Sequence, residues 1–194
     1  MDNDIRKKQI KNLIITLLIF VIFYLIDQLT KYLATINLPY NEATEVGTTV
    51  EFIPYFLSFK LTYNRGIALG LFSNVPWLIL LFTLLGTIIL CYFCSFNDWK
   101  YAKLKSFSLT LALAGCVANF FDRFITIFNL FESKGVVDMI VWYQWDCFTE
   151  FFGMGKTIFN FADFILITAA ILFIIDLLFL SERRKKKYEQ NHHR

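Results

Sequence analysis

Two carboxylates, Asp138 and Asp163, stand in stretches that are otherwise apolar, residues 135–140 and 159–165. An ionised carboxylate is costly in such surroundings unless it is solvated, paired or used in chemistry. Two neighbouring carboxyl groups that share one proton can supply both a general acid and a general base, because like charges at close range cannot easily both ionise. If folding brings the two together, the sequence therefore predicts acid–base chemistry by the pair.

Other catalytic chemistries have little support in the sequence. The two histidines, His192 and His193, lie in the terminal tail, which excludes a Ser-His or Cys-His triad and argues against a His-ligated zinc site. Four cysteines show no disulfide-framework spacing, and Cys91 and Cys94 lie inside an apolar segment, where packing explains them. Glycine-rich phosphate loops are absent as well. We therefore expect no metal and no cofactor.

The composition indicates an integral membrane protein. Of its 194 residues 57% are hydrophobic, and the mean hydropathy is +0.53. A soluble domain of this size cannot bury so much apolar surface. Four segments approach the roughly 20 apolar residues that cross a bilayer, at about residues 13–33, 75–96, 107–128 and 158–180. The fold class expected is all-α, in a single integral membrane domain over residues 1–194. The net charge of +3 is too small to indicate nucleic-acid binding.

The basic residues predict the orientation of the four spans. Lysines and arginines cluster before the first span, between the second and third, and after the fourth, in residues 6–11, 100–105 and 183–187. Because such clusters favour the cytoplasmic side, both termini and a basic tail at 181–194 are predicted to be cytoplasmic. Residues 34–74 and 129–157 then face outward.

The outer segments carry two recognisable patterns. Apolar and polar residues alternate from Leu57 to Tyr63, and residues 50–52 can pair with them, which predicts a small extracytoplasmic β-sheet. The second outer segment is predicted to be an aromatic loop that contains Asp138. Its aromatic residues are typical of a membrane interface: Trp142, Tyr143, Trp145, Phe148, Phe151 and Phe152.

With this topology, polar groups from distant segments converge on the outer face. They are Asp27 and Lys31 at the end of the first span, Asn64 and Gly66 before the second, Asn119, Asp122 and Arg123 near the end of the third, and the two aspartates. Asn119, Asp122 and Arg123 are spaced i, i+3 and i+4, so they share one helical face. Asp122 and Arg123 form either a structural ion pair or contacts to a substrate, and the sequence leaves both open.

Five segments, taken together and in order, resemble the lipoprotein signal peptidases (signal peptidase II). They are residues 27–31 (DQLTK), 64–70 (NRGIALG), 119–123 (NFFDR), 135–138 (GVVD) and 159–163 (FNFAD). The chain departs from the usual family pattern at Ala118, where glycine is usual, and in a longer link at 124–134.

The resemblance implies roles for the residues in these segments. Asp138 and Asp163 match the family's catalytic pair. Substrate-binding residues, which contact the substrate or orient the pair, are implied at Asn64, Asn119, Arg123 and Asn160, and supporting residues at Asp27, Lys31, Gly66 and Asp122. At the amino-terminal end of the fourth span, the helix dipole favours the ionised form of Asp163.

The resemblance also implies the reaction and its place. The chain would be a bacterial cell-membrane protease that cuts diacylglyceryl-modified prolipoproteins just before the lipidated cysteine. Its partners would be that substrate and membrane lipids, with no nucleic acid and no required oligomer. The strongest alternative is a small proton- or cation-coupled transporter that uses the same aspartates, although acidic groups at mid-membrane depth and repeated halves are missing. A structural scaffold would leave the convergent polar layer unexplained.

Overall fold

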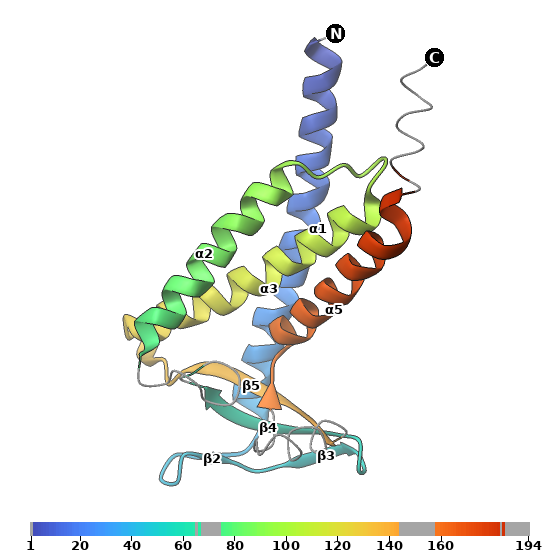
Figure 1. Ribbon diagram of the computed structural model, residues 1–194. Helices are drawn as coiled ribbons and strands as arrows, with labels where there is room; N and C mark the ends of the chain where they lie inside the picture. Colours follow the sequence, from blue (N-terminus) through green and yellow to red (C-terminus); the bar gives the residue numbers. More distant parts are fainter. Residues whose placement is uncertain (1, 65, 67–74, 144–157, 183, 185–194) are drawn as a thin grey trace.

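The computed structural model describes residues 2–64, 66, 75–143, 158–182 and 184. Its main body is a bundle of four helices: α1 (Asp2–Asn37), α2 (Pro76–Ser95), α3 (Lys103–Ile127) and α5 (Phe161–Ile175), which continues as the π-helical segment η4 (Asp176–Leu180). Each is long and apolar enough to cross a membrane. Figure 1 shows the sheet at one end of the bundle and the start of α1 at the other. The prediction of four apolar spans is confirmed.

Helix α3 lies at the centre and packs against the other three helices. Its small and apolar residues interlock with α5, where Leu111, Ala114, Ile165 and Ala169 form a buried cluster. Helix α2, by contrast, exposes large apolar side chains along most of its length, including Phe82, Ile88 and Tyr92. Such a surface is stable next to lipid and unfavourable next to water.

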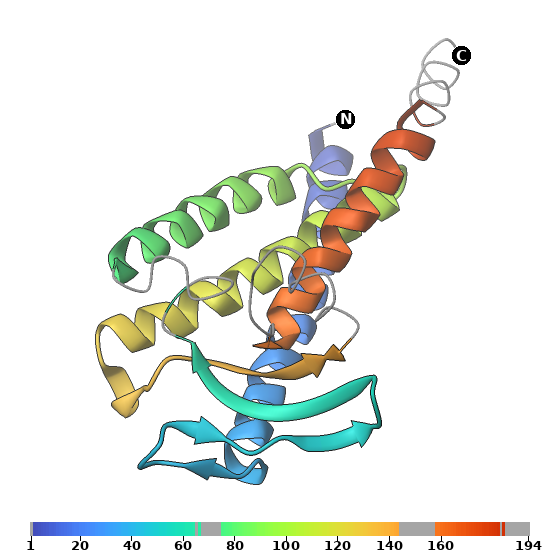
Figure 2. The same ribbon diagram turned by 60° about the horizontal axis from the view of Figure 1, so that its bottom comes forward.

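A four-stranded antiparallel sheet closes one end of the bundle. Its strands follow the order β3 (Val50–Ile53), β4 (Leu57–Asn64), β5 (Val136–Trp142) and β6 (Ile158–Phe159). A second, two-stranded sheet joins β1 (Tyr40–Asn41) to β2 (Val46–Gly47). In Figure 2, β5 lies between β4 and the helix ends. The predicted pairing of residues 50–52 with Leu57–Tyr63 is confirmed, with a bulge between Glu51 and Ile53.

The end of α1 rests on this sheet. Ala34 of α1, Leu61 of β4 and Met139 of β5 form a buried cluster. A short turn, η2 (Leu130–Glu132), lies in the link from α3 to β5, and Asn129 and Phe131 there have positive φ. The long link at 124–134 thus divides into the last turn of α3, this turn and the entry to β5.

One expectation from the sequence needs correction. Asp138 is not in a loop, because it belongs to β5 in the interior of the sheet. Helix α1 extends beyond the predicted span of residues 13–33 as far as Asn37, so Asp27 and Lys31 lie within the helix and not in its last turn. Of the predicted aromatic loop, Trp142 ends β5 and packs its ring on Phe56, while residues 145–152 lie outside the described residues. The orientation across the membrane stays a prediction.

Candidate functional site

Asp138 is a buried carboxylate on the central strand β5. Only 3% of its surface is exposed, and its strand neighbour on β4 is Thr62. Two side-chain amides hold its two oxygens: Asn64 Nδ2 donates to Oδ2 over 2.9 Å, and Asn160 Nδ2 donates to Oδ1 over 2.8 Å. The strand pairing of β5 and these two donors fix the position of the carboxylate.

Asp163 lies in the first turn of α5, where it helps to cap the helix. The backbone N–H of Asp163 donates to Asn160 Oδ1 over 3.0 Å, and the N–H of Asn160 donates to Asp163 Oδ2 over 3.3 Å. This reciprocal arrangement satisfies amide groups that a helix start would otherwise leave unpaired. The remaining oxygen, Oδ1, accepts a hydrogen bond of 2.9 Å from Asn119 Nδ2 on α3.

Asn160 connects the two aspartates. Its side-chain nitrogen holds Asp138 while its side-chain oxygen and backbone hold Asp163, and the residue is 1% exposed. The carboxylates, far apart in sequence, therefore lie within reach of one asparagine. Burial, and after it the negative charge of Asp163, raise the pKa of Asp138 from its ordinary 3.8 to about 7. At neutral pH the Asp138 carboxyl can therefore exchange a proton.

A second chain of contacts fixes Asn64, the other asparagine on Asp138. Asn64 Oδ1 accepts a hydrogen bond of 2.9 Å from the backbone N–H of Gly66, which leaves the amide nitrogen for Asp138. Arg123 Nη1 on α3 in turn donates to the carbonyl oxygen of Gly66 over 2.6 Å. Arg123 is therefore connected to Asp138 by successive hydrogen bonds through Gly66 and Asn64.

Beneath the site, a buried ionic group joins α1 to α3 and α5. Lys31 Nζ lies 2.6 Å from Asp27 Oδ2 and 2.5 Å from Asp122 Oδ2. Asp27 Oδ1 accepts a hydrogen bond of 2.7 Å from the backbone N–H of Ala162, the residue before Asp163. The open question about Asp122 is thereby answered in part: its ion pair in the described structure is with Lys31, not with Arg123.

Gln28 is a member of this group to which the sequence assigned no role. Its Nε2 donates to Asp122 Oδ1 over 3.1 Å and to Asp27 Oδ2 over 3.2 Å. The signal was available in the sequence, because Gln28 stands beside Asp27 and three residues before Lys31. Spacing alone, however, could not show that Asp122 lies opposite.

Two glycines let the elements of the site approach closely. A Cβ at Gly115 of α3 would lie 2.8 Å from the carbonyl oxygen of Ala162. Gly135, just before β5, has φ +149°, and a Cβ there would lie 3.0 Å from the carbonyl oxygen of Asn64. Gly115 therefore allows the close contact of α3 with α5, and Gly135 allows the close contact of the start of β5 with β4.

Two buried polar atoms at the site have no hydrogen-bond partner within the described part of the chain. They are Asn119 Oδ1, an acceptor, and Arg123 Nε, a donor. Buried polar atoms in native proteins usually have partners.

The same described residues contain no group of three His, Cys, Asp or Glu side chains that could hold a metal ion. Asp176, the remaining acidic residue of the fourth span, lies apart and pairs with Arg184 over 2.7 Å.

Comparisons with known proteins find similar proteins that match most of the chain. A family model described as signal peptidase (SPase) II matches residues 19–179. A lipoprotein signal peptidase from Staphylococcus aureus (strain bovine RF122 / ET3-1) is 33% identical over 172 residues, which cover 89% of this chain and 93% of the relative. Another, from Fusobacterium nucleatum subsp. nucleatum, is 29% identical over 180 residues, covering 92% of this chain and 95% of the relative.

Two solved structures, each described as a bacterial membrane enzyme studied by the in meso method, share the fold. The first, at 2.3 Å resolution, has a TM-score of 0.63 and 32% identity, covering 84% of this chain and 87% of its own. The second, at 1.9 Å resolution, has a TM-score of 0.64 and 31% identity, covering 86% of this chain and 94% of its own.

Proposed function

Because the chain belongs to the signal peptidase II family, a family of proteases that act on lipoprotein precursors, we propose that it is a membrane aspartic endopeptidase. Its catalytic groups are Asp138 and Asp163. Its substrate is a prolipoprotein already modified with diacylglycerol on the cysteine that follows the signal peptide. The bond it cuts is the one just before that cysteine.

The observation that carries this proposal is the shared asparagine. Asn160 contacts both aspartates, so a water molecule and a peptide carbonyl can meet both carboxyl groups at once. Ion relay, the alternative, requires acidic groups along a path through the membrane. Here both aspartates are grouped at the sheet end of the bundle, Asp138 on a strand and Asp163 in the first turn of α5.

The chemistry follows from one proton shared by the pair. The ionised carboxylate takes a proton from water as the water oxygen attacks the scissile carbonyl carbon, and the protonated carboxyl group donates its proton to the carbonyl oxygen. The resulting tetrahedral intermediate collapses when the C–N bond breaks and the pair delivers a proton to the leaving amine. A pKa of about 7 at Asp138 supports a singly protonated pair near neutral pH. The proton belongs to the pair, not to one residue.

The unpartnered atoms supply a place for the substrate backbone. Asn119 Oδ1 can accept a hydrogen bond from a peptide N–H, and Arg123 Nε can donate one to a peptide carbonyl. Asn119 already contacts Asp163, so a peptide bound to it lies next to the catalytic pair. Asn64 and Asn160 then act by orienting Asp138 rather than by binding substrate directly.

The charge distribution supports an active site at the outer face of a bacterial cell membrane. The sheet and the start of α5 lie at one end of the bundle, and the start of α1 and the α2–α3 link lie at the other (Figure 1). The first end carries the two aspartates and the second carries the lysines. Positive charge favours the cytoplasmic side. A signal helix and its lipid can then enter sideways from the bilayer, with the scissile bond near water.

The test is cleavage of a diacylglyceryl-modified prolipoprotein by the detergent-purified protein. Asp138→Asn and Asp163→Asn should each lower kcat by about 10²–10⁴-fold, while Asp4→Asn on the exposed start of α1 serves as the matched control and should cleave normally. Near-normal cleavage by either site variant would refute the assignment of the pair. Ion flux in liposomes without cleavage would favour the transporter.

A further inference from the structure

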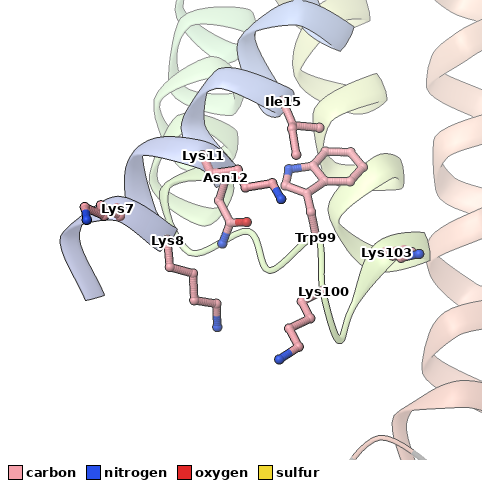
Figure 3. Close-up of a pocket in the computed structure, with 8 residues that line it drawn as sticks. All are labelled: Lys7, Lys8, Lys11, Asn12, Ile15, Trp99, Lys100 and Lys103. Carbon is pink, nitrogen blue, oxygen red and sulfur yellow. The ribbon is translucent and has the colours of Figure 1, made fainter. Parts of the chain in front are cut away.

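A cleft of about 510 Å³ opens at the end of the bundle opposite the sheet (Figure 3). It lies between the first turns of α1 and the link from α2 to α3. Five of its eight lining residues are lysines, and none is acidic: Lys7, Lys8, Lys11, Lys100 and Lys103. Its volume is in the range of about 300–1,000 Å³ that small-molecule sites occupy. The proposed protease reaction uses none of these residues.

Besides the ion pair of Lys8 with Asp98, bonds that do not involve the lysines hold the walls of this basic cleft together. Trp99 Nε1 donates to Thr16 Oγ1 over 3.0 Å, and Asn12 Nδ2 donates to the carbonyl oxygen of Asn97 over 2.8 Å. Asn97 itself is buried and donates to Thr16 Oγ1 over 3.1 Å. These hydrogen bonds hold the α2–α3 link against α1, so the lysines line a cleft whose two walls are bonded to each other.

The positive charge of the cleft is only partly balanced by the described residues. Lys8 forms an ion pair of 2.8 Å with Asp98, and Lys100 Nζ lies 4.8 Å from the ring centroid of Tyr101. Within the described parts of the chain, no ion pair with an acidic residue involves the other four lysines. Helix α3 begins at Lys103 and has no side-chain cap, so the positive end of its dipole adds to the field. The cleft is thus suited to an anion.

The position of the cleft along α1 favours a lipid over a dissolved anion. Directly after the lysines, Leu13, Ile14, Leu17 and Leu18 of α1 are each more than half exposed, and Ile15 lines the cleft itself. Trp99, at the junction, is a residue typical of the headgroup level. A dissolved phosphate would use only the lysines, whereas a phospholipid would contact the lysines with its headgroup and the leucines with its acyl chains.

We propose that this cleft binds the phosphate headgroup of an anionic phospholipid in the leaflet opposite the aspartate site. Lys7, Lys11 and Lys100 pair with the phosphate, and the acyl chains lie along the exposed apolar face of α1. Basic pockets between membrane-spanning helices recognise anionic headgroups in this way.

The experiment is native mass spectrometry of the delipidated full chain, titrated with dioleoyl phosphatidylglycerol or dioleoyl phosphatidylcholine. The two lipids share their acyl chains, so a difference in binding reports the headgroup. We expect tighter binding of phosphatidylglycerol, and we expect the triple variant Lys7→Gln, Lys11→Gln, Lys100→Gln to weaken it at least about tenfold. Lys8 stays unchanged because it pairs with Asp98.

The matched control removes the same charge elsewhere on the same predicted side of the membrane. Lys185→Gln, Lys186→Gln, Lys187→Gln in the tail should retain the preference for phosphatidylglycerol. An equal loss in both triple variants, or no preference in the wild type, would overturn the proposal. Full displacement by glycerol 1-phosphate at matched concentration would refute the lipid assignment. If the triple variant melts early in phosphatidylcholine, the single Lys11→Glu variant provides the same test and must lose the preference.

Discussion

The side-chain nitrogen of Asn160 donates a hydrogen bond of 2.8 Å to Asp138. This bond joins the N-cap of α5 to strand β5. The same side chain caps α5 through its oxygen. Asn160 therefore has two separable roles: its side-chain oxygen caps the amino-terminal end of α5, and its side-chain nitrogen orients Asp138. That separation makes its role testable by substitution.

Asn160→Ser should separate these two roles. Serine is a good N-cap, so α5 keeps its start, but serine cannot supply the amide donor to Asp138. We expect a melting temperature close to that of the wild type and a loss of about 1.5–3 kcal/mol of transition-state stabilisation, or roughly 10–160-fold in kcat/KM. Asn160→Ala should lose activity and also about 1 kcal/mol of stability. Wild-type activity in the serine variant would contradict a role for the Asn160–Asp138 contact.

The raised pKa of Asp138 predicts how activity depends on pH. Because one shared proton is required, kcat/KM should fall as pH rises through about 7, where the buried pair loses that proton. The measurement is a pH–rate profile of the purified protein with lipidated substrate. A rate that stays constant from pH 6 to pH 9 would contradict the shared-proton mechanism.

The same shift predicts how stability depends on pH. Between the ordinary value of 3.8 and about 7, the folded state keeps a proton at Asp138 that the unfolded state has lost. The contribution of this group to the free energy of unfolding should therefore be fully present at low pH. It should fall by up to roughly 1.4 kcal/mol per pH unit as pH rises towards 7, and level off above. Thermal melts from pH 5 to pH 8 should show this slope in the wild type and a shallower one in Asp138→Asn.

The sequence alone predicted the helices well, because a long apolar run has few other solutions in a chain of this composition. It failed at β5. Residues 136–142 are apolar except for Asp138, and the strand is enclosed by β4 and β6 and by the helix ends, so it lacks the polar–apolar alternation that identified β4. Its partner, β4, is also distant in the sequence, which no local pattern reveals.

The candidate site was predicted better than the strand that carries it. The segments of the family pattern include Asn64, Asn119, Asn160 and both aspartates, and the structure brings all five into one set of contacts. The predicted fourth span begins at residue 158, three residues before α5, because β6 is as apolar as a span. A usable signal existed there, since Asn160 and Asp163 have the spacing of a helix cap.

Lys31→Met tests whether the buried ionic group supports the site. The substitution leaves Asp27 and Asp122 close together without their shared cation, and Asp27 contacts the backbone just before Asp163. We expect a loss of roughly 3–5 kcal/mol of stability, measured by thermal melting in detergent. Lys134→Met, at the exposed ion pair with Glu42, is the control and should melt close to the wild type. Equal melting of the two variants would mean that burial adds nothing to the Lys31 pairs.

Gly115→Ala tests the closeness of α3 and α5 at the aspartates. The added Cβ would lie 2.8 Å from both the Ala162 carbonyl oxygen and Leu166 Cγ, so α5 must move away and stretch the bond from Asn119 to Asp163. Overpacking of this kind costs about 1–3 kcal/mol of stability. We also expect kcat to fall more than KM changes, because the displaced group belongs to the proposed catalytic pair. Gly86→Ala is the matched control on α2, where the only described atom that the new Cβ would meet is the Cys116 sulfur at 3.3 Å. If both glycine variants kept full activity and stability, the close contact would have no part in positioning Asp163.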